Sequence, residues 1–165
     1  MTRILLNLFL LFIIFLVGVL SGRMIENRSN RKTAQSKLLM ETYDTLLNDF
    51  VEKNIDIATF FERNKVAIYG LRGKYGHDFF GLLKGNLPEN TIYSDGNAEV
   101  MKEFKGRRVF DKEELIKTDF DYLIILPLNH FYDICNEFIE NGVRREKICS
   151  VVDVMHYIKM GNKDV

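Results

Sequence analysis

The pattern of apolar positions divides the chain into stretches of different texture. Residues 4–20 (ILLNLFLLFIIFLVGVL) form one apolar run without a charged side chain. Over residues 37–63, apolar residues recur at three- and four-residue steps, which is the spacing of an amphipathic helix. From residue 64 onward, short apolar runs alternate with helical stretches, which predicts strands joined by helices.

The first run has two interpretations, a transmembrane anchor and a cleaved signal peptide. A bilayer core takes roughly 20 apolar helical residues, with about 17 near the lower limit. The run of seventeen exceeds the roughly 7–15 residues of a signal-peptide core, and the following VLSGRM lacks an A-x-A-like cleavage site. We therefore favour a transmembrane anchor over residues 1–22.

More basic residues follow this apolar run than precede it. Only Arg3 lies before the run, and residues 23–36 form a basic juxtamembrane linker. The basic residues after the run are Arg23, Arg28, Arg31, Lys32 and Lys37. Positive charge tends to stay on the cytoplasmic side, so this asymmetry predicts a single-pass protein of the cell membrane with a cytoplasmic C-terminal domain.

The rest of the chain is interpreted as a helical lead-in (residues 37–63), a domain (64–160) and a tail (161–165). Asn54 or Asp56 is expected to cap a second short helix in the lead-in. The predicted strands are 65–69, 91–94, 107–110, 121–127 and 148–152, and the predicted helices are 75–85, 98–104, 112–117, 130–141 and 153–160. This alternation predicts an α/β fold with a small, doubly wound, parallel sheet of five strands in the order 3-2-1-4-5.

A glycine-rich segment leaves the first predicted strand. Gly70, Gly73 and Gly76 stand where dinucleotide-binding folds turn tightly from strand into helix and admit a phosphate. Arg72 and Lys74 flank this loop, with phosphate contact and a purely solvated role as alternatives. The segment is therefore a candidate phosphate-binding loop.

Asp95 follows the second predicted strand directly. An acid at this place in a dinucleotide-binding fold binds ribose hydroxyls, about 20 residues beyond the loop. The next residue is Gly96, and Asp-Gly often simply opens a turn. Ribose contact and a plain turn stay open as alternatives for Asp95.

Composition excludes some classes of function. The formal net charge is zero, so no nucleic-acid partner is expected. The three histidines and two cysteines lie too far apart in sequence for a familiar metal-binding spacing. We therefore expect no metal, and cysteines in the reduced form.

The glycine spacing resembles that of extended short-chain dehydrogenases, which act on nucleotide-sugars. Their chemistry uses a Tyr-x-x-x-Lys pair in which lysine lowers the pKa of the tyrosine. None of the seven tyrosines here is followed by lysine four residues later. The chain is also too short for the substrate-binding portion of those enzymes, so we expect no catalysis by this chain alone.

A broader resemblance covers residues 37–160. The segments KVAIYGLRGKYG, TIYSDGN, FKGRRVFDKEEL, DYLIIL and NGVRREKI are similar to those of small Rossmann-like domains encoded in bacterial surface-polysaccharide loci. Two features depart from the family pattern. One is an extra residue between Gly70 and Gly73, and the other is Pro127 at the end of the fourth predicted strand.

The resemblance implies a function in surface-polysaccharide biosynthesis. It implies an accessory, membrane-anchored domain that binds a nucleotide or nucleotide-sugar through Gly70, Arg72, Gly73, Lys74, Gly76 and Asp95, with NAD(P) or a nucleotide-sugar as the ligand. The alternative is a ligand-free scaffold that recruits a glycosyltransferase or another assembly protein to the membrane. A third hypothesis is an oxidoreductase whose catalytic residues come from a partner chain.

Overall fold

The computed structural model describes residues 30–161 of the chain. The chain divides into two compact units, Met1–Gln35 and Ser36–Val165. Residues 30–35, the described part of the first unit, are helical. The fold below is that of the second unit, which begins with a helix over residues 36–52, named the lead-in helix here.

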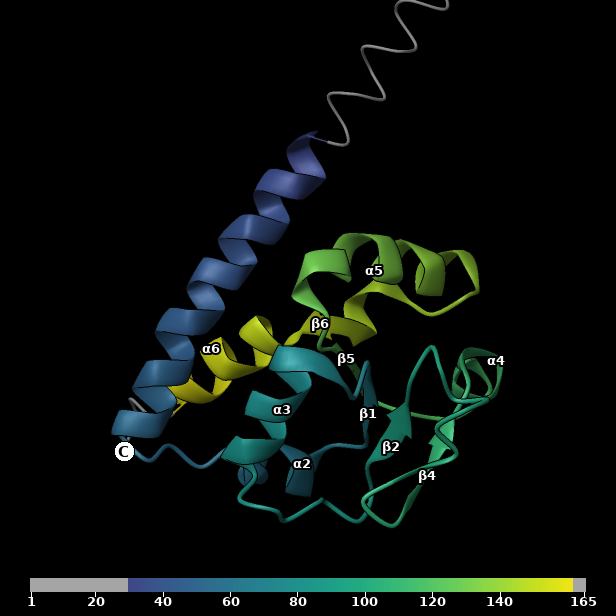
Figure 1. The fold of residues 1–165 in the computed structure, drawn as a ribbon, viewed down its shortest axis with the longest axis horizontal. Coiled ribbons are helices and arrows are strands. Elements are labelled where there is room, and N and C mark those ends of the chain that lie inside the picture. Colours follow the sequence, from purple (N-terminus) through teal and green to yellow (C-terminus); the bar gives the residue numbers. More distant parts are fainter. Residues whose placement is uncertain (1–29, 162–165) are drawn as a thin grey trace, which may run out of the picture. The chain divides into compact units, whose positions relative to one another are not determined.

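The centre of the second unit is a six-stranded sheet (Figure 1). Its strands are β1 (Val66–Tyr69), β2 (Ile92–Ser94), β3 (Glu103–Phe104), β4 (Arg107–Phe110), β5 (Tyr122–Ile125) and β6 (Ile148–Ser150). They lie side by side in the order β3-β4-β2-β1-β5-β6. Every neighbouring pair is parallel except β3 with β4, which is antiparallel.

The predicted five-stranded, all-parallel sheet is therefore wrong, because the chain forms a mixed sheet of six strands. The helix expected at 98–104 is the source of the error. Its first residues make a single turn, in which the N–H of Met101 donates to the carbonyl of Asn97 at 2.8 Å. The chain then enters β3 and reverses at Lys105 and Gly106, which have φ angles of 49° and 79°. Two consecutive positive φ angles are typical of a tight hairpin turn.

No helix within residues 30–161 is long and apolar enough to cross a membrane. The transmembrane helix that formed part of the fold prediction is thus not seen in the described part of the chain. Residues 1–22, on which that prediction falls, lie outside the described residues. The cell-membrane location and the cytoplasmic orientation stay predictions.

Helices cover both faces of the sheet. The helices are α2 (Ala58–Arg63), α3 (Gly73–Leu82), α4 (Lys112–Ile116), α5 (Phe131–Glu140) and α6 (Val151–Gly161). The lead-in helix, α2, α3 and α6 share one apolar core with Val66, Ile68 and Ile124 of the sheet. Helices α4 and α5 share the other core with Ala67 and Leu123. Side chains of a strand alternate between faces, so β1 and, after the exposed Tyr122, β5 are buried on both sides.

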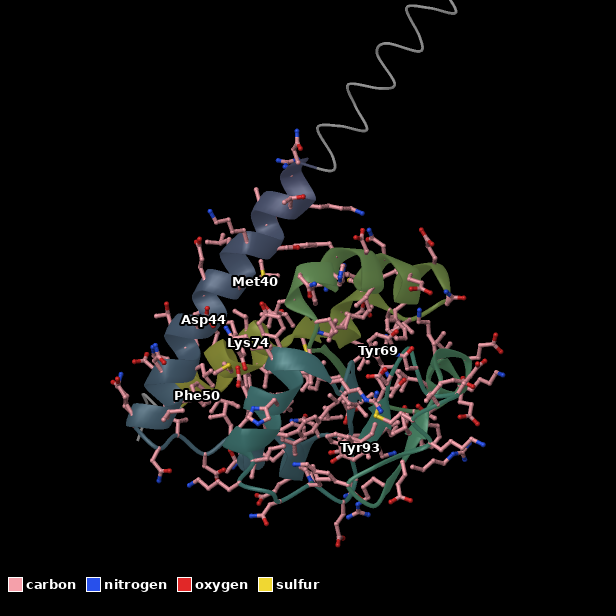
Figure 2. The ribbon with its side chains drawn as sticks, in the orientation of Figure 1. Met40, Asp44, Phe50, Tyr69, Lys74 and Tyr93 are labelled. Carbon is pink, nitrogen blue, oxygen red and sulfur yellow. The ribbon has the colours of Figure 1, made fainter. Side chains whose placement is uncertain are left out.

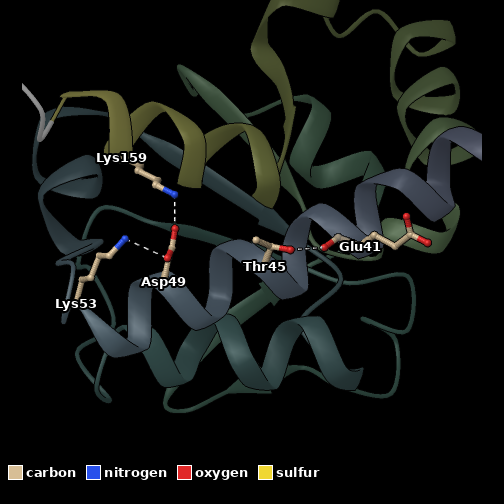
Figure 3. A network of polar contacts seen from close by, with 5 residues as sticks. All are labelled: Glu41, Thr45, Asp49, Lys53 and Lys159. Carbon is tan, nitrogen blue, oxygen red and sulfur yellow. Dashed lines mark hydrogen bonds and ion pairs between the residues drawn. The ribbon is translucent and has the colours of Figure 1, made fainter.

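The lead-in helix packs on the domain through apolar contacts and a carboxylate. Tyr43, Leu46 and Phe50 are at most 3% exposed. On the same helix, Asp49 accepts hydrogen bonds from Lys159 of α6 and from Lys53, the latter at 3.1 Å (Figure 3). Hydrogen bonds from both lysines lower the pKa of the Asp49 carboxyl.

Helix α6 begins at Val151, two residues earlier than predicted, and Ser150 caps it. The N–H of Asp153 donates to Oγ of Ser150 at 3.2 Å, and the N–H of Ser150 donates to Oδ2 of Asp153 at 2.7 Å. This reciprocal pair is a capping box, with aspartate in the place of the usual glutamate. The box lies at the junction between β6 and α6.

Candidate functional site

The glycine loop lies at the carboxyl end of β1 and is anchored at Gly70. The N–H of Gly70 donates to the carbonyl of Ser94 at 3.0 Å, which ties the loop to the end of β2. Gly70 has a φ of 85°, and a β-carbon there would lie 2.4 Å from the ring of Pro127. No other residue fits this position without movement. Gly70 and Pro127, which looked unrelated in sequence, are therefore packing partners.

The other two glycines have different roles. A β-carbon on Gly76 would lie 2.3 Å from the carbonyl oxygen of Leu71, so this glycine allows α3 to pack closely on the loop. Gly73 is the first residue of α3 and has a φ of 82°. Nothing lies within 4 Å of the β-carbon it would carry. Open space thus adjoins the start of α3.

Asp95 fastens the loop from the neighbouring strand. Its Oδ2 accepts from the N–H of Leu71 at 2.9 Å, and its Oδ1 accepts from the N–H of Asn97, also at 2.9 Å. The side chain is buried, with 7% exposure. Asp95 therefore opens the turn after β2 and holds the loop at the same time. Its contact with a ribose stays a prediction.

The two cations of the loop reach in different directions. The Nε–H of Arg72 donates to Sδ of Met101 at 3.1 Å, across the loop. The Nζ of Lys74 lies 2.6 Å from Oδ1 of Asp44 on the lead-in helix (Figure 2). The hydrogen bond to Asp44 raises the pKa of Lys74. Five of the six predicted site residues thus either belong to the loop or, like Asp95, form a hydrogen bond with it, while the side chain of Lys74 contacts the lead-in helix.

The amino end of α3 has the properties of an anion site. Its N-cap, Arg72, makes no side-chain capping hydrogen bond, and the first turn contains no acidic residue. The first N–H groups of a helix have no partner within the helix, and the helix dipole is positive at this end. In an α/β sheet this place, outside the carboxyl ends of the strands, is where ligands bind.

A cavity of about 380 Å³ lies beside the loop, beyond the ends of β2 and β4. Its lining includes five carboxylates and one lysine, namely Asp95, Glu99, Asp111, Glu113, Glu137 and Lys112. Lys112 pairs with Glu137, and its Nζ lies 5.7 Å from the centres of the Tyr69 and Phe138 rings. The cavity is acidic, so it suits hydroxyl groups or a cation better than a phosphate.

Sequence reasoning did not identify this cavity. Its residues come from the connection after β2, from α4 and from α5, which are separated along the chain by up to about 45 residues. The acidic segment DKEEL directly follows the predicted strand at 107–110. Because parallel strands end at a shared edge of the sheet, this segment could have indicated carboxylates near Asp95. Of the six predicted site residues, Asp95 is the one that lines the cavity.

Nucleophilic and metal chemistry have little support in the described residues. No group of three or more histidine, cysteine, aspartate or glutamate side chains within residues 30–161 is arranged to hold a metal ion. Burial raises the pKa of the Cys149 thiol to about 12 and raises that of Cys135. Both thiols are therefore protonated at neutral pH and are poor nucleophiles.

Comparison with known proteins gives one family. The model of a family described as C2185-like, N-terminal, matches residues 62–149, which is just over half of the chain. The matched segment begins at the end of α2 and extends into β6, so it contains the glycine loop, Asp95 and the acidic cavity. A search among curated proteins found no match.

Proposed function

The chain belongs to the C2185-like N-terminal family, and we propose that its domain binds a nucleotide or nucleotide-sugar without catalysing a reaction on it. The observation that supports this proposal is the uncapped amino end of α3, which opens from a glycine loop at the carboxyl end of a parallel strand. A phosphate there accepts hydrogen bonds from free N–H groups and meets the positive end of the helix dipole.

In this proposal the ligand lies across the loop. Its phosphates lie at Gly73, where no side chain occupies the approach. Its sugar or ribose hydroxyls lie toward the acidic cavity, because carboxylates are good acceptors for hydroxyl donors. Asp95 serves mainly to hold the loop, since each of its oxygens already accepts a backbone hydrogen bond.

The biological setting proposed is surface-polysaccharide biosynthesis, with this chain as an accessory protein. This part rests on the motifs that resemble Rossmann-like domains of polysaccharide loci. A nucleotide-sugar suits that setting because it is the activated donor from which glycosyltransferases build polysaccharides. The domain would hold or present the donor, and a glycosyltransferase partner would use it.

Isothermal titration of the full chain with NAD, UDP-glucose and coenzyme A tests the proposal. We expect heat of binding for at least one of them. Gly73→Asp places a carboxylate at the amino end of α3 and should weaken that binding about tenfold or more, because two negative charges then compete for one site. Gly85→Asp is the matched control, since Gly85 has the same φ of 82° and open surroundings but lies after the other end of α3. A folded chain that binds none of the three ligands overturns the proposal.

The second candidate is a ligand-free scaffold that recruits a partner protein. The observation in its favour is that the carboxylate of Asp95 already accepts from the N–H of Leu71, so this N–H of the loop has a partner without a phosphate. Exposed apolar side chains also exist on α6, where Tyr157 and Met160 are each 69% exposed. If Gly73→Asp folds and leaves the cell's surface polysaccharide unchanged, the scaffold is favoured over the nucleotide-binding role.

A further inference from the structure

The ion pair between Asp44 and Lys74 joins the lead-in helix to the first turn of α3. The two residues are 30 positions apart in sequence, and their atoms Oδ1 and Nζ lie 2.6 Å apart. Both side chains remain more than half exposed. A ligand at the amino end of α3 would therefore approach a lysine whose charge is already matched by a carboxylate.

The protein holds Asp44 in this place through its neighbours. Tyr43 is fully buried, and its ring makes an edge contact with Tyr75 at a centroid distance of 5.1 Å. Leu46, on the same buried side of the helix, is 3% exposed. Tyr75 directly follows Lys74, so packing fixes the two charged residues close to each other. The packing of Tyr43 against Tyr75 thus keeps the backbone positions of Asp44 and Lys74 near each other.

The other charges around the loop do not replace the positive charge that Asp44 cancels. The adjoining cavity carries five carboxylates, with its one lysine paired to Glu137. Arg72 is the remaining nearby cation of the loop, and it lies against Met101. Each additional negative charge on a ligand therefore meets a loop with one cation, Arg72, that no carboxylate is shown to match, and an acidic cavity.

We propose that Asp44 determines the charge of the ligand that this site accepts. By holding Lys74, it makes the loop prefer diphosphate diesters, such as nucleotide-sugars, over nucleotides with a terminal phosphate. A terminal phosphate carries about −1.5 to −2 charge at neutral pH, whereas a phosphate diester carries a single charge. This inference rests on the proposed nucleotide-binding function and deepens it.

The test compares affinities for UDP-glucose, UDP and UTP in the full chain and in Asp44→Asn. We expect the unmodified chain to bind UDP-glucose more tightly than UDP or UTP. Asp44→Asn should tighten UDP and UTP by about two- to fivefold, the range of an exposed ion pair, and change UDP-glucose less. Adding Lys74→Ala to Asp44→Asn should remove this gain, because the freed lysine is its cause.

Glu41→Gln is the matched control. It removes the same charge from the same helix, where Glu41 pairs with Lys37 at 3.8 Å, and should leave all three affinities in their original ratio. If nucleotides bind but Asp44→Asn keeps the original ratio of UDP to UDP-glucose, the inference is overturned and the proposed function stands. If no nucleotide binds to either chain, the proposed function is overturned and the inference with it.

Discussion

Pro127 lies where a β-carbon on Gly70 would be, with its Cδ and Cγ both 2.4 Å from that position. Gly70 follows β1, and Pro127 lies shortly after β5, the strand that pairs with β1. The contact therefore joins the segments that leave the carboxyl ends of β1 and β5. It also explains a glycine that otherwise looks like part of a phosphate-binding motif.

Gly70→Ala should destabilise the domain. The substitution adds a steric clash to a positive φ, and together these cost about 2–4 kcal/mol in free energy of unfolding. Urea unfolding followed by circular dichroism measures the loss. Gly81→Ala is the control, because Gly81 lies in α3 with open surroundings and should gain about 0.5–1 kcal/mol. Equal effects of the two substitutions would contradict the role given to Pro127.

Asp95→Ala should loosen the glycine loop. The substitution removes the acceptor for the N–H groups of Leu71 and Asn97, and charge-assisted hydrogen bonds contribute about 1.5–3 kcal/mol each. Hydrogen exchange at the amide of Leu71 should become faster, whereas the amide of Ile68 in β1 should change little. Unchanged exchange at Leu71 would show that Asp95 does not hold the loop.

Sequence patterns located the central strands well because burial on both faces leaves a strong signal. The segments YLII of β5 and VAIY of β1 contain only apolar or aromatic residues. A short run of this kind is typical of a buried strand. The strand predicted at 107–110 is β4, but β3 and its hairpin with β4 left no such signal. Ala98 and Met101 are buried three positions apart, which imitates a helix, and the turn at Lys105 lacks the Asn-Gly or Asp-Gly pair that usually marks a hairpin.

The site could be predicted as a position but not as a set of contacts. Spacing alone brought Gly70, Gly73 and Asp95 to one edge of the sheet. It could not show that Asp95 bonds to Leu71, because a carboxylate after a strand serves a loop and a ribose equally well. Nor could it join Lys74 to Asp44, since that contact depends on how the lead-in helix packs on α3.

Tyr43→Phe should keep or increase stability. The hydroxyl of Tyr43 is buried and has no hydrogen-bond partner among the described residues, so removing it relieves a desolvation cost of about 1–3 kcal/mol. Tyr43→Ala, in contrast, removes the buried ring and should cost about 3–5 kcal/mol. Thermal unfolding of the two variants separates the effects. A loss above 1 kcal/mol for Tyr43→Phe would reveal a partner for the hydroxyl.

Asp49 should make the docking of the lead-in helix sensitive to acid. Hydrogen bonds from Lys159 and Lys53 lower the pKa of Asp49 in the folded chain, below the value of about 3.9 that an unfolded aspartate has. A group with a lowered pKa stabilises the folded state above its unfolded pKa, and this contribution is lost as the pH falls through the folded pKa. The unmodified chain should therefore be more stable than Asp49→Asn at neutral pH, and the difference should shrink below about pH 4.

Denaturant unfolding of the unmodified chain and of Asp49→Asn between pH 7 and pH 3 measures this difference. Asp56→Asn serves as the control, because Asp56 is exposed and, within residues 30–161, accepts from the nearby N–H of Ala58 and not from a lysine. Adding salt should reduce the Asp49 contribution, since Lys159 and Lys53 act through charge. A difference between the unmodified chain and Asp49→Asn that persists unchanged at pH 3 would mean that the carboxylate charge is not what fastens the lead-in helix to α6.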